Sequence, residues 1–518
     1  MTTMNRPVSG RWLALGGISL GLLAAGLDIT VLSLALPTLA GALNANESQL
    51  QWFVTAYTLA LTAAMLPAGL IGDRLGRKRV MLVALAVFGA SSAGCALAPN
   101  AAVFIAARVA LGLAGAAMVV MALSIITVLF DEAERPRAIG IWGAANFLAL
   151  PLGPIVGGWM LSNLWWGWVF IVNVPVVVVG ILAVAALVPE SRSVNRPAID
   201  WLGVAGSSAG LTLFMYGVIE AGRVGWGDPG TIGALLAGVL VIAAFAAWEL
   251  RLASTGRTPL VDLSLFRSPS FTGGVVLAAM GIFGLAGLLF TLPQLWQGVQ
   301  GLDAQGAGVR LLPVIGGMVV AAVLADRVAV RVGARITLAF GLLLLAAGLG
   351  TGSTLTLASG DAFTAGWTFV SGLGAGLGLA TAASAAMVEL DAERSGVGSA
   401  LVQAVIKLGP AFGAAVLGSV MNDAYRNGVT VTGLPADLVA TIQSSVFAGL
   451  AAAHQAGSDA LAQSVKLAFV GALGDALRIA AVIAVAGVPV ALALLPGRSA
   501  SAAAAGAQSG HDRAIVGG

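Results

Sequence analysis

One carboxylate lies deep inside an apolar stretch of this sequence. Asp28 stands within Trp12–Leu39, a mostly apolar run long enough to cross a bilayer as a helix. A charged side chain at the centre of an inserted helix costs about 2.5–3.5 kcal/mol, and burial favours the neutral form of a carboxyl group. Such a group can take up a proton on one side of a membrane and release it on the other. A structural ion pair within a helix bundle is the alternative.

Arg108 is the candidate partner of Asp28, because it stands in another apolar stretch, Ala101–Ile126. We assume that the first stretch runs outward and that this one, the fourth, runs inward. A rise of about 1.5 Å per residue then places Asp28 about 16 Å and Arg108 about 10 Å from the outer ends of their helices. Protonation of Asp28 is therefore expected to release Arg108. A purely structural arginine that donates to backbone carbonyl groups is the alternative.

Lys407 is a second cation inside an apolar stretch, and Gln403 precedes it by one helical turn. A buried lysine disfavours a dication nearby and suits an anionic, neutral or zwitterionic substrate. The alternatives are that Lys407 pairs with a carboxylate, or that its extended stem carries the amine to the membrane surface. Aromatic side chains are further candidates for lining a substrate cavity, although packing or lipid contact would use them equally well. The cavity candidates are Trp52, Tyr57, Phe147, Phe283, Trp296, Gln403 and Lys407.

A short basic loop follows the second apolar stretch. Its glycines, Gly72 and Gly76, allow a tight turn. Asp73 can accept hydrogen bonds from a helix N-terminus or from an arginine such as Arg74 or Arg77. We expect this loop to act as a latch between the two halves of the protein, with a purely topological use of its charges as the alternative.

The fifth apolar stretch carries the run Gly153, Pro154, Gly157 and Gly158, with Pro151 just before it. Proline removes a backbone donor, and glycine removes side-chain bulk. The residues therefore predict a bend in this helix and a face that packs closely on a neighbour.

Other kinds of site lack the residues that they would need. The one cysteine, Cys95, excludes a disulfide within the chain, and the two histidines, His454 and His511, stand apart from other ligand residues. We expect no metal, no catalytic site and therefore no enzyme. The absence of a GxxxxGKS/T phosphate loop excludes ATP drive at the motif level. No basic domain is present, so nucleic acid is not an expected partner.

Composition requires that most of the surface face lipid, because 58% of the 518 residues are hydrophobic and 9% are charged, against about 25% charged in soluble proteins. Fourteen apolar stretches are predicted to span the membrane as helices. They are Trp12–Leu39, Leu50–Ile71, Val80–Ala98, Ala101–Ile126, Ala138–Leu161, Trp165–Val188, Trp201–Ile219, Thr231–Leu250, Phe271–Pro293, Val309–Ala325, Ile336–Ala358, Phe363–Met387, Gly398–Met421 and Asp475–Leu495.

Basic residues and weak repeats organise these stretches. Most of the 26 lysines and arginines fall in loops on one side if the N-terminus is cytoplasmic, so both termini are expected inside and the number of spans is even. GPxxG runs at Gly153–Gly157 and Gly409–Gly413 stand eight stretches apart. Two six-helix bundles with two helices between them explain that offset. The fold class is therefore an all-α membrane protein with fourteen helices arranged as six, two and six in pseudo-symmetric halves.

Domain boundaries follow from this arrangement. The external connection 422–474 is expected to cap the outer mouth, with a helix over Leu438–Leu461, or to be a mobile loop. The predicted parts are an N-terminal bundle (1–190), two linking helices (191–268), a C-terminal bundle (269–498) and a disordered cytoplasmic tail (499–518).

Four motifs together resemble the fourteen-span drug:proton antiporters of the major facilitator superfamily, the exporters of quaternary ammonium compounds and antibiotics. They are the run Leu27–Pro37, the loop Gly69–Arg79, the residues Arg108, Gly112 and Gly115, and the run Gly143–Gly158. The resemblance implies a coupling role for Arg108 and a span-5 motif that marks exporters and limits proton leak. The region around Lys407 departs from the pattern, since multivalent-cation exporters carry acidic residues there.

The leading interpretation is a proton-driven exporter of amphipathic drugs, antibiotics or other toxic compounds, a multi-pass monomer in the bacterial inner membrane. Its expected partners are the small-molecule substrate, protons and the lipid bilayer, and the proton gradient replaces any cofactor. An exporter of an endogenous metabolite or lipid is the alternative, and an uptake symporter is a weaker one.

Overall fold

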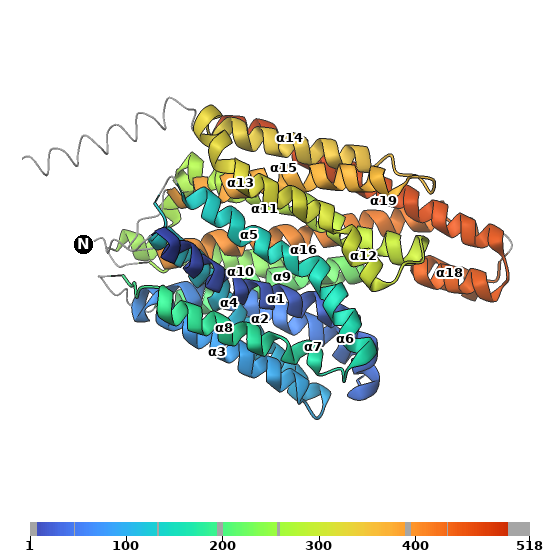
Figure 1. Ribbon diagram of the computed structural model, residues 1–518, viewed down its shortest axis with the longest axis horizontal. Coiled ribbons are helices and arrows are strands. Elements are labelled where there is room, and N and C mark those ends of the chain that lie inside the picture. Colours follow the sequence, from blue (N-terminus) through green and yellow to red (C-terminus); the bar gives the residue numbers. More distant parts are fainter. Residues whose placement is uncertain are drawn as a thin grey trace, which may run out of the picture.

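The computed structural model describes residues 8–45, 47–131, 134–193, 200–255, 259–388, 395–431 and 434–495. These ranges hold helices and no strands. Figure 1 shows long helices packed side by side, roughly along one direction. The predicted disordered tail, 499–518, lies outside the described residues.

The first bundle occupies the lower part of Figure 1. One of its helical segments, which runs from Arg135 to Asn163, is broken by a π turn. The helices of this bundle are α1 (Val8–Ala42), α2 (Glu47–Leu75), α3 (Arg77–Ala96), α4 (Ala101–Leu129), α5 (Arg135–Leu152), η1 (Gly153–Gly157), α6 (Gly158–Asn163), α7 (Trp168–Ile171) and α8 (Asn173–Leu187).

The second bundle lies above the first in Figure 1. Its helices are η2 (Leu263–Arg267), α11 (Pro269–Gln294), η3 (Leu295–Val299), α12 (Ala304–Arg310), α13 (Leu312–Val332), α14 (Ala334–Gly352), α15 (Asp361–Val388), α16 (Ser395–Gly428), α17 (Ala436–Ser444), α18 (Val446–Gln455) and α19 (Asp459–Leu494).

Two helices stand between the bundles in the sequence, α9 (Trp201–Val224) and α10 (Pro229–Ser254). Helix α9 contacts both bundles. The hydroxyl of Ser208 donates to the carbonyl oxygen of Ala63 on α2 at 2.7 Å, and Trp226, just beyond α9, donates to Ser419 on α16 at 3.2 Å. Helix α10 packs against α9 and leaves leucines such as Leu240 exposed.

Thirteen of the described helices are long and apolar enough to cross a membrane. The prediction of an all-α membrane protein is therefore confirmed, while fourteen spans in a six, two and six arrangement stay a prediction. The fifth predicted span, Ala138–Leu161, accounts for the difference. It is helical, and a π turn interrupts it between Leu152 and Gly158.

The connection predicted over 422–474 is helical at both of its ends, and its place outside the membrane stays a prediction. Helix α16 continues to Gly428, and the last long helix already begins at Asp459 instead of Asp475. The helix expected over Leu438–Leu461 is confirmed only in part, because two short helices, α17 and α18, share that region. The chain is extended at Ser445, whose hydroxyl accepts from the backbone of α18, so one continuous helix cannot form.

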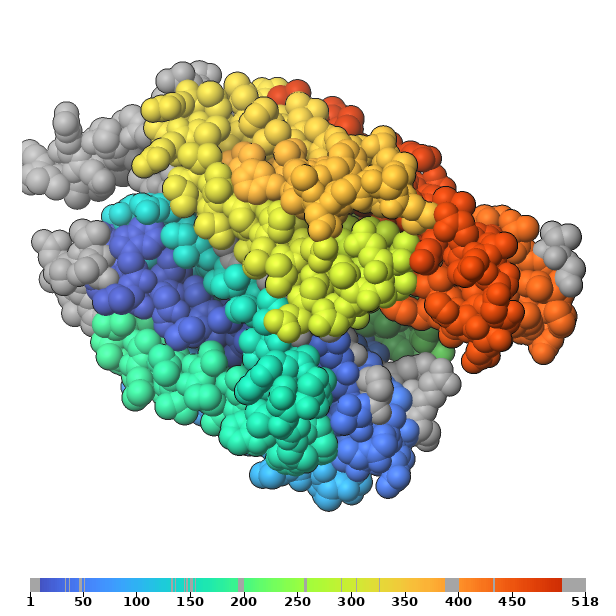
Figure 2. All heavy atoms as spheres, turned by 45° about the vertical axis from the view of Figure 1, so that its right-hand side comes forward, coloured from blue at the N-terminus to red at the C-terminus, as the bar shows by residue number. Residues whose placement is uncertain are grey.

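The two bundles meet along a seam that Figure 2 shows between the blue-to-teal and the yellow-to-red residues. At Gly140 on α5 the approach is close. A Cβ placed there would lie 3.0 Å from the Cβ of Ala322 on α13 and 3.6 Å from that of Ala380 on α15. Small residues thus let helices of opposite bundles touch, as is usual where lipid gives no hydrophobic drive to association.

Candidate functional site

A buried ion pair joins α1 to α4 inside the first bundle. A terminal nitrogen of Arg108 donates to Oδ2 of Asp28, and each residue is 1% exposed. Oδ1 of Asp28 has no hydrogen-bond partner among the described residues. The two charges that the sequence suggested as partners are therefore in contact, and one carboxylate oxygen has no donor. Their part in proton coupling stays a prediction.

Close packing of α2 on α4 fixes the arginine. A Cβ added to Gly112 would lie 2.8 Å from the Cβ of Ala60, so a larger residue would push the helices apart. This approach lets Nε of Arg108 donate to the carbonyl oxygen of Phe53 at 2.8 Å. The guanidinium carbon also lies 4.8 Å from the centre of the Tyr57 ring, within cation–π range. Arg108 thus pairs with Asp28 and also donates to a backbone carbonyl group, which are the two alternatives that the sequence left open.

A cavity of about 390 Å³ lies between the two bundles, within the range of about 300–1,000 Å³ that is usual for small-molecule sites. Helices α1, α4 and α5 form one side, and α11, α15 and α16 form the other. On each helix the lining residues recur every three or four positions, which is the spacing of one helix face. Apolar walls come from residues that include Leu22, Leu123, Ile139, Ile282, Leu289 and Leu379.

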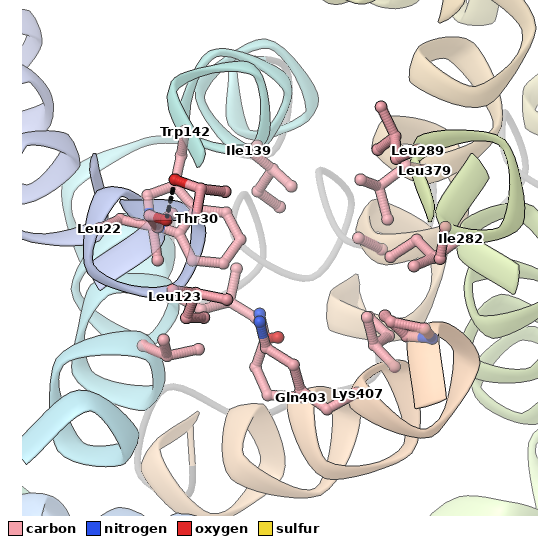
Figure 3. Close-up of a pocket in the computed structure, with 18 of the residues that line it drawn as sticks. Leu22, Thr30, Leu123, Ile139, Trp142, Ile282, Leu289, Leu379, Gln403 and Lys407 are labelled. Atoms are coloured by element: carbon pink, nitrogen blue, oxygen red, sulfur yellow. Dashed lines mark hydrogen bonds between the residues drawn. The ribbon is translucent and has the colours of Figure 1, made fainter. Parts of the chain in front are cut away.

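Polar groups reach the cavity from both bundles. Gln403 and Lys407 stand on α16, and Figure 3 shows Thr30 and Trp142 on the opposite side, on α1 and α5. The Thr30 hydroxyl lies 3.2 Å from the carbonyl oxygen of Ala149, which ties α1 to α5. Nε1 of Trp142 is buried and has no partner in the described part of the chain. No aspartate or glutamate occurs among the described lining residues.

Most of the aromatic cavity candidates lie elsewhere. Trp296 is buried in the core of the second bundle, as is Phe283, and Tyr57 packs over Arg108. Trp52 is 44% exposed and does not line the cavity. None of these four lines this cavity, since aromatic residues serve core packing as readily as ligand binding, and their use in a substrate site stays a prediction. The side chain of Phe147 lies outside the described residues.

Trp142 is the aromatic lining residue that the sequence analysis does not single out. It stands directly before Gly143, which the span-5 motif includes, and three residues after Ile139, which lines the same cavity. That spacing on one helix face is the signal that could have identified it.

The π turn η1 bends the segment that begins with α5. Pro154 has no N–H, so the regular backbone ladder cannot continue through it. Gly153 packs so closely on Thr30 that a Cβ would overlap its side chain, and a Cβ on Gly157 would lie 2.9 Å from Cγ1 of Val31. The predicted close-packed face is present, and Gly158 begins α6 immediately afterwards. Single π turns inside helices frequently occur at functional sites.

The basic loop between α2 and α3 is held by a buried ion pair. Nε and a terminal nitrogen of Arg77 lie 3.1 Å and 2.8 Å from Oδ1 of Asp73. The backbone N–H of Arg77 donates to the carbonyl oxygen of Ser191 at 2.8 Å, and that of Ser193 donates to the Asp73 carbonyl oxygen at 2.9 Å. The loop thus docks on the segment that follows α8.

Other residues of this loop complete the turn. Gly76 has a φ of 112°, a backbone conformation that favours glycine, and the Glu190 carboxylate lies against it. Gly72 is buried against α4, whereas Arg74 is exposed. The partners described above all belong to the first bundle, and residues 389–394 of the second lie outside the described part. A latch between the bundles therefore stays a prediction.

Solved structures share this fold at low sequence identity. The proton:xylose symporter XylE superposes with a TM-score of 0.62 at 16% identity, over 94% of this chain and 96% of that one. A human organic anion transporter gives a TM-score of 0.60 at 15% identity, over 94% and 100%.

Curated relatives align over nearly the whole chain. The tetracenomycin C resistance and export protein of Streptomyces glaucescens is 32% identical over 506 residues, which cover 94% of this chain and 93% of that protein. The multidrug efflux pump LfrA of Mycolicibacterium smegmatis is 31% identical, over 94% and 96%. The methyl viologen resistance protein SmvA of Salmonella typhimurium is 31% identical, over 84% and 88%.

A family model agrees with these similarities. The model described as Major Facilitator Superfamily matches residues 18–414, a range that includes the ion pair, the basic loop, the bent helix and all of the described cavity lining. The chain therefore belongs to the Major Facilitator Superfamily, and it is a multi-pass membrane transporter of small molecules.

Proposed function

We propose that this protein exports amphipathic drugs, antibiotics or other toxic compounds across the bacterial inner membrane in exchange for protons. The observation that carries the proposal is the buried Asp28–Arg108 pair, which stands beside a cavity enclosed by both bundles. Relatives named for drug efflux or drug resistance, at about a third sequence identity, support export as the direction.

Helix α1 links the ion pair to the cavity. Ile29 and Thr30 line the cavity, while the adjacent Asp28 contacts α4. A proton on Asp28 removes the charge that holds Arg108, so α1 gains freedom to move relative to α4. A ligand in the cavity contacts the same helix, so proton binding and substrate binding both act on α1.

The segment from Arg135 to Asn163 contacts both the cavity and the second bundle. Helix α5 lines the cavity through Ile139 and Trp142 and contacts the second bundle through Gly140. We infer that the segment 135–163 also crosses the membrane, which brings the total to fourteen spans. These spans are arranged as six, two and six, and α9 and α10 join the two bundles. Both termini would then be cytoplasmic, and the monomer would alternate between inward- and outward-open states.

Reconstitution into proteoliposomes with a pH gradient tests this function. Tetracenomycin C serves as the probe, and a trapped pH dye reports proton movement. We expect substrate and protons to move in opposite directions, and we expect Asp28→Asn to abolish coupled movement. Movement of both in the same direction would support an uptake symporter, and unchanged coupling in Asp28→Asn would overturn the proposal.

A further inference from the structure

The cavity contains a cation for which the structure describes no counter-charge. Lys407 lines the cavity, and it makes no described hydrogen bond or ion pair. The described lining residues include no acidic side chain. A desolvated ammonium group without a partner is costly, and a ligand that brings a negative charge offsets that cost.

Two further groups converge on the same space. Gln403, one turn before Lys407 on α16, is 3% exposed and makes no described hydrogen bond. Across the cavity, the indole N–H of Trp142 is buried without an acceptor in the described part of the chain, and that residue is 8% exposed. Figure 3 shows these groups on opposite walls of one apolar space. An unpaired buried donor is a cost that an acceptor atom on a ligand would remove.

We propose that this cavity selects apolar ligands that carry an acidic group, such as a carboxylate or a sulfonate, over cationic ligands of the same shape. The acidic group pairs with Lys407 and accepts from Gln403 or Trp142, while the apolar body contacts the leucine and isoleucine walls. This inference rests on the proposed export function and names the substrate class for it.

The proton balance of this binding is simple. An acid and an amine share one proton: when a neutral acid enters, its proton moves from the acid oxygen to Nζ of Lys407. When the lysine is already charged, the anion binds directly. Both routes end in the same ion pair, which is short and charge-assisted. A dication such as methyl viologen meets only repulsion from the same group.

Matched probes separate charge from shape. 9-Anthracenecarboxylate, 9-anthracenemethanol and 9-anthracenemethylammonium share one ring system, and their binding to the full-length protein in nanodiscs is measured by fluorescence. We expect the carboxylate to bind about tenfold more tightly than the ammonium compound. Lys407→Gln should abolish that preference while binding of the neutral alcohol stays unchanged, and Lys407→Glu should reverse it.

Two further variants complete the test. Lys466→Gln makes the same substitution on α19, outside the cavity lining, and should leave the preference intact. Trp142→Phe keeps a ring but removes the N–H, and should weaken carboxylate binding about fivefold, within the usual range for one hydrogen bond. Equal loss of all three probes in Lys407→Gln would make Lys407 a structural residue and overturn the inference.

The same experiment keeps this inference apart from the export proposal. Proton-coupled transport with equal binding of the three probes would overturn the acidic preference alone. Selective binding of the carboxylate without any coupled transport would overturn the exporter proposal, and with it the naming of acids as exported substrates.

Discussion

Nε of Arg108 on α4 lies 2.8 Å from the carbonyl oxygen of Phe53 on α2. Since a terminal nitrogen of the same guanidinium pairs with Asp28 on α1, one side chain ties three helices together. The bond to Phe53 does not depend on the protonation state of Asp28. The arginine can therefore stay attached to α2 and α4 while its hold on α1 changes.

Arg108→Lys should separate charge from geometry. Lysine keeps the positive charge but is a single point donor, so it cannot reach Phe53 and Asp28 in the forked arrangement of a guanidinium. We expect proton-coupled transport to fall by about tenfold or more, the equivalent of about 1.4 kcal/mol. The measurement is proton flux in proteoliposomes on addition of substrate.

The matched control is Arg478→Lys, because Arg478 forms an exposed pair with Asp475 on one helix. That variant should transport at the rate of the unmodified protein. Normal coupling in Arg108→Lys would show that charge alone suffices and that the contact with Phe53 is dispensable.

The ion pair could be predicted from the sequence, whereas the cavity could be predicted only in part. Asp28 and Arg108 are charges in apolar spans, and their burial cost makes a partner necessary. An aromatic residue needs no charged partner when it is buried, so its type does not tell a core position from a cavity position. Trp296 lies in a core and Trp142 lines the cavity, although both are tryptophans. Gln403 and Lys407 could be predicted because a polar group inside a span is costly unless it has a partner or a function.

Span boundaries show a second limit of the sequence. The prolines and glycines of the segment 135–163 predict a bend, but neither they nor hydropathy predict that the interruption is a π turn. Helix α19 begins before the apolar stretch that was predicted to span the membrane: its first residues, from Asp459, are capped by the Ser458 hydroxyl. Capping and tertiary contact decide such ends, and neither is visible in a hydropathy profile.

Asp73→Ala should destabilise the protein, because it leaves the buried Arg77 guanidinium without its carboxylate. Removal of one partner from a buried pair costs about 3–5 kcal/mol. We expect a lower unfolding temperature in detergent, followed by tryptophan fluorescence. Asp131→Ala removes a largely exposed carboxylate and should change the unfolding temperature little. Equal unfolding temperatures for the two variants would contradict the structural importance of the Asp73–Arg77 pair.

Gly153→Ala should impair transport through a steric conflict. The added methyl group would overlap the Thr30 side chain, which forms part of the cavity wall. We expect export to fall severalfold while expression persists, because α1 and α5 must separate to relieve the overlap. Gly16→Ala places a methyl group in open space on α1 and is the control. Drug export by cells that express each variant is the measurement, and full activity of Gly153→Ala would contradict the tight contact.

Glu249 and Asp200 form a carboxyl pair at the junction of α9, α10 and the segment that leads to η2. A Cβ on Gly203 would lie 2.6 Å from Oε1 of Glu249 and 2.5 Å from Oδ2 of Asp200, so these oxygens are close neighbours. Glu249 accepts from the backbone N–H of Val261 at 3.1 Å, while its Oε1 has no described donor. Glu249 thus joins α10 to the segment that leads to η2.

Glu249→Gln should therefore keep this junction intact, because the amide oxygen can still accept from the backbone N–H of Val261. Glu249→Ala leaves the Val261 N–H unpaired and should lower the free energy of unfolding by about 1–3 kcal/mol. Thermal unfolding in detergent is the measurement. Equal unfolding temperatures for Glu249→Ala and Glu249→Gln would contradict the importance of this contact.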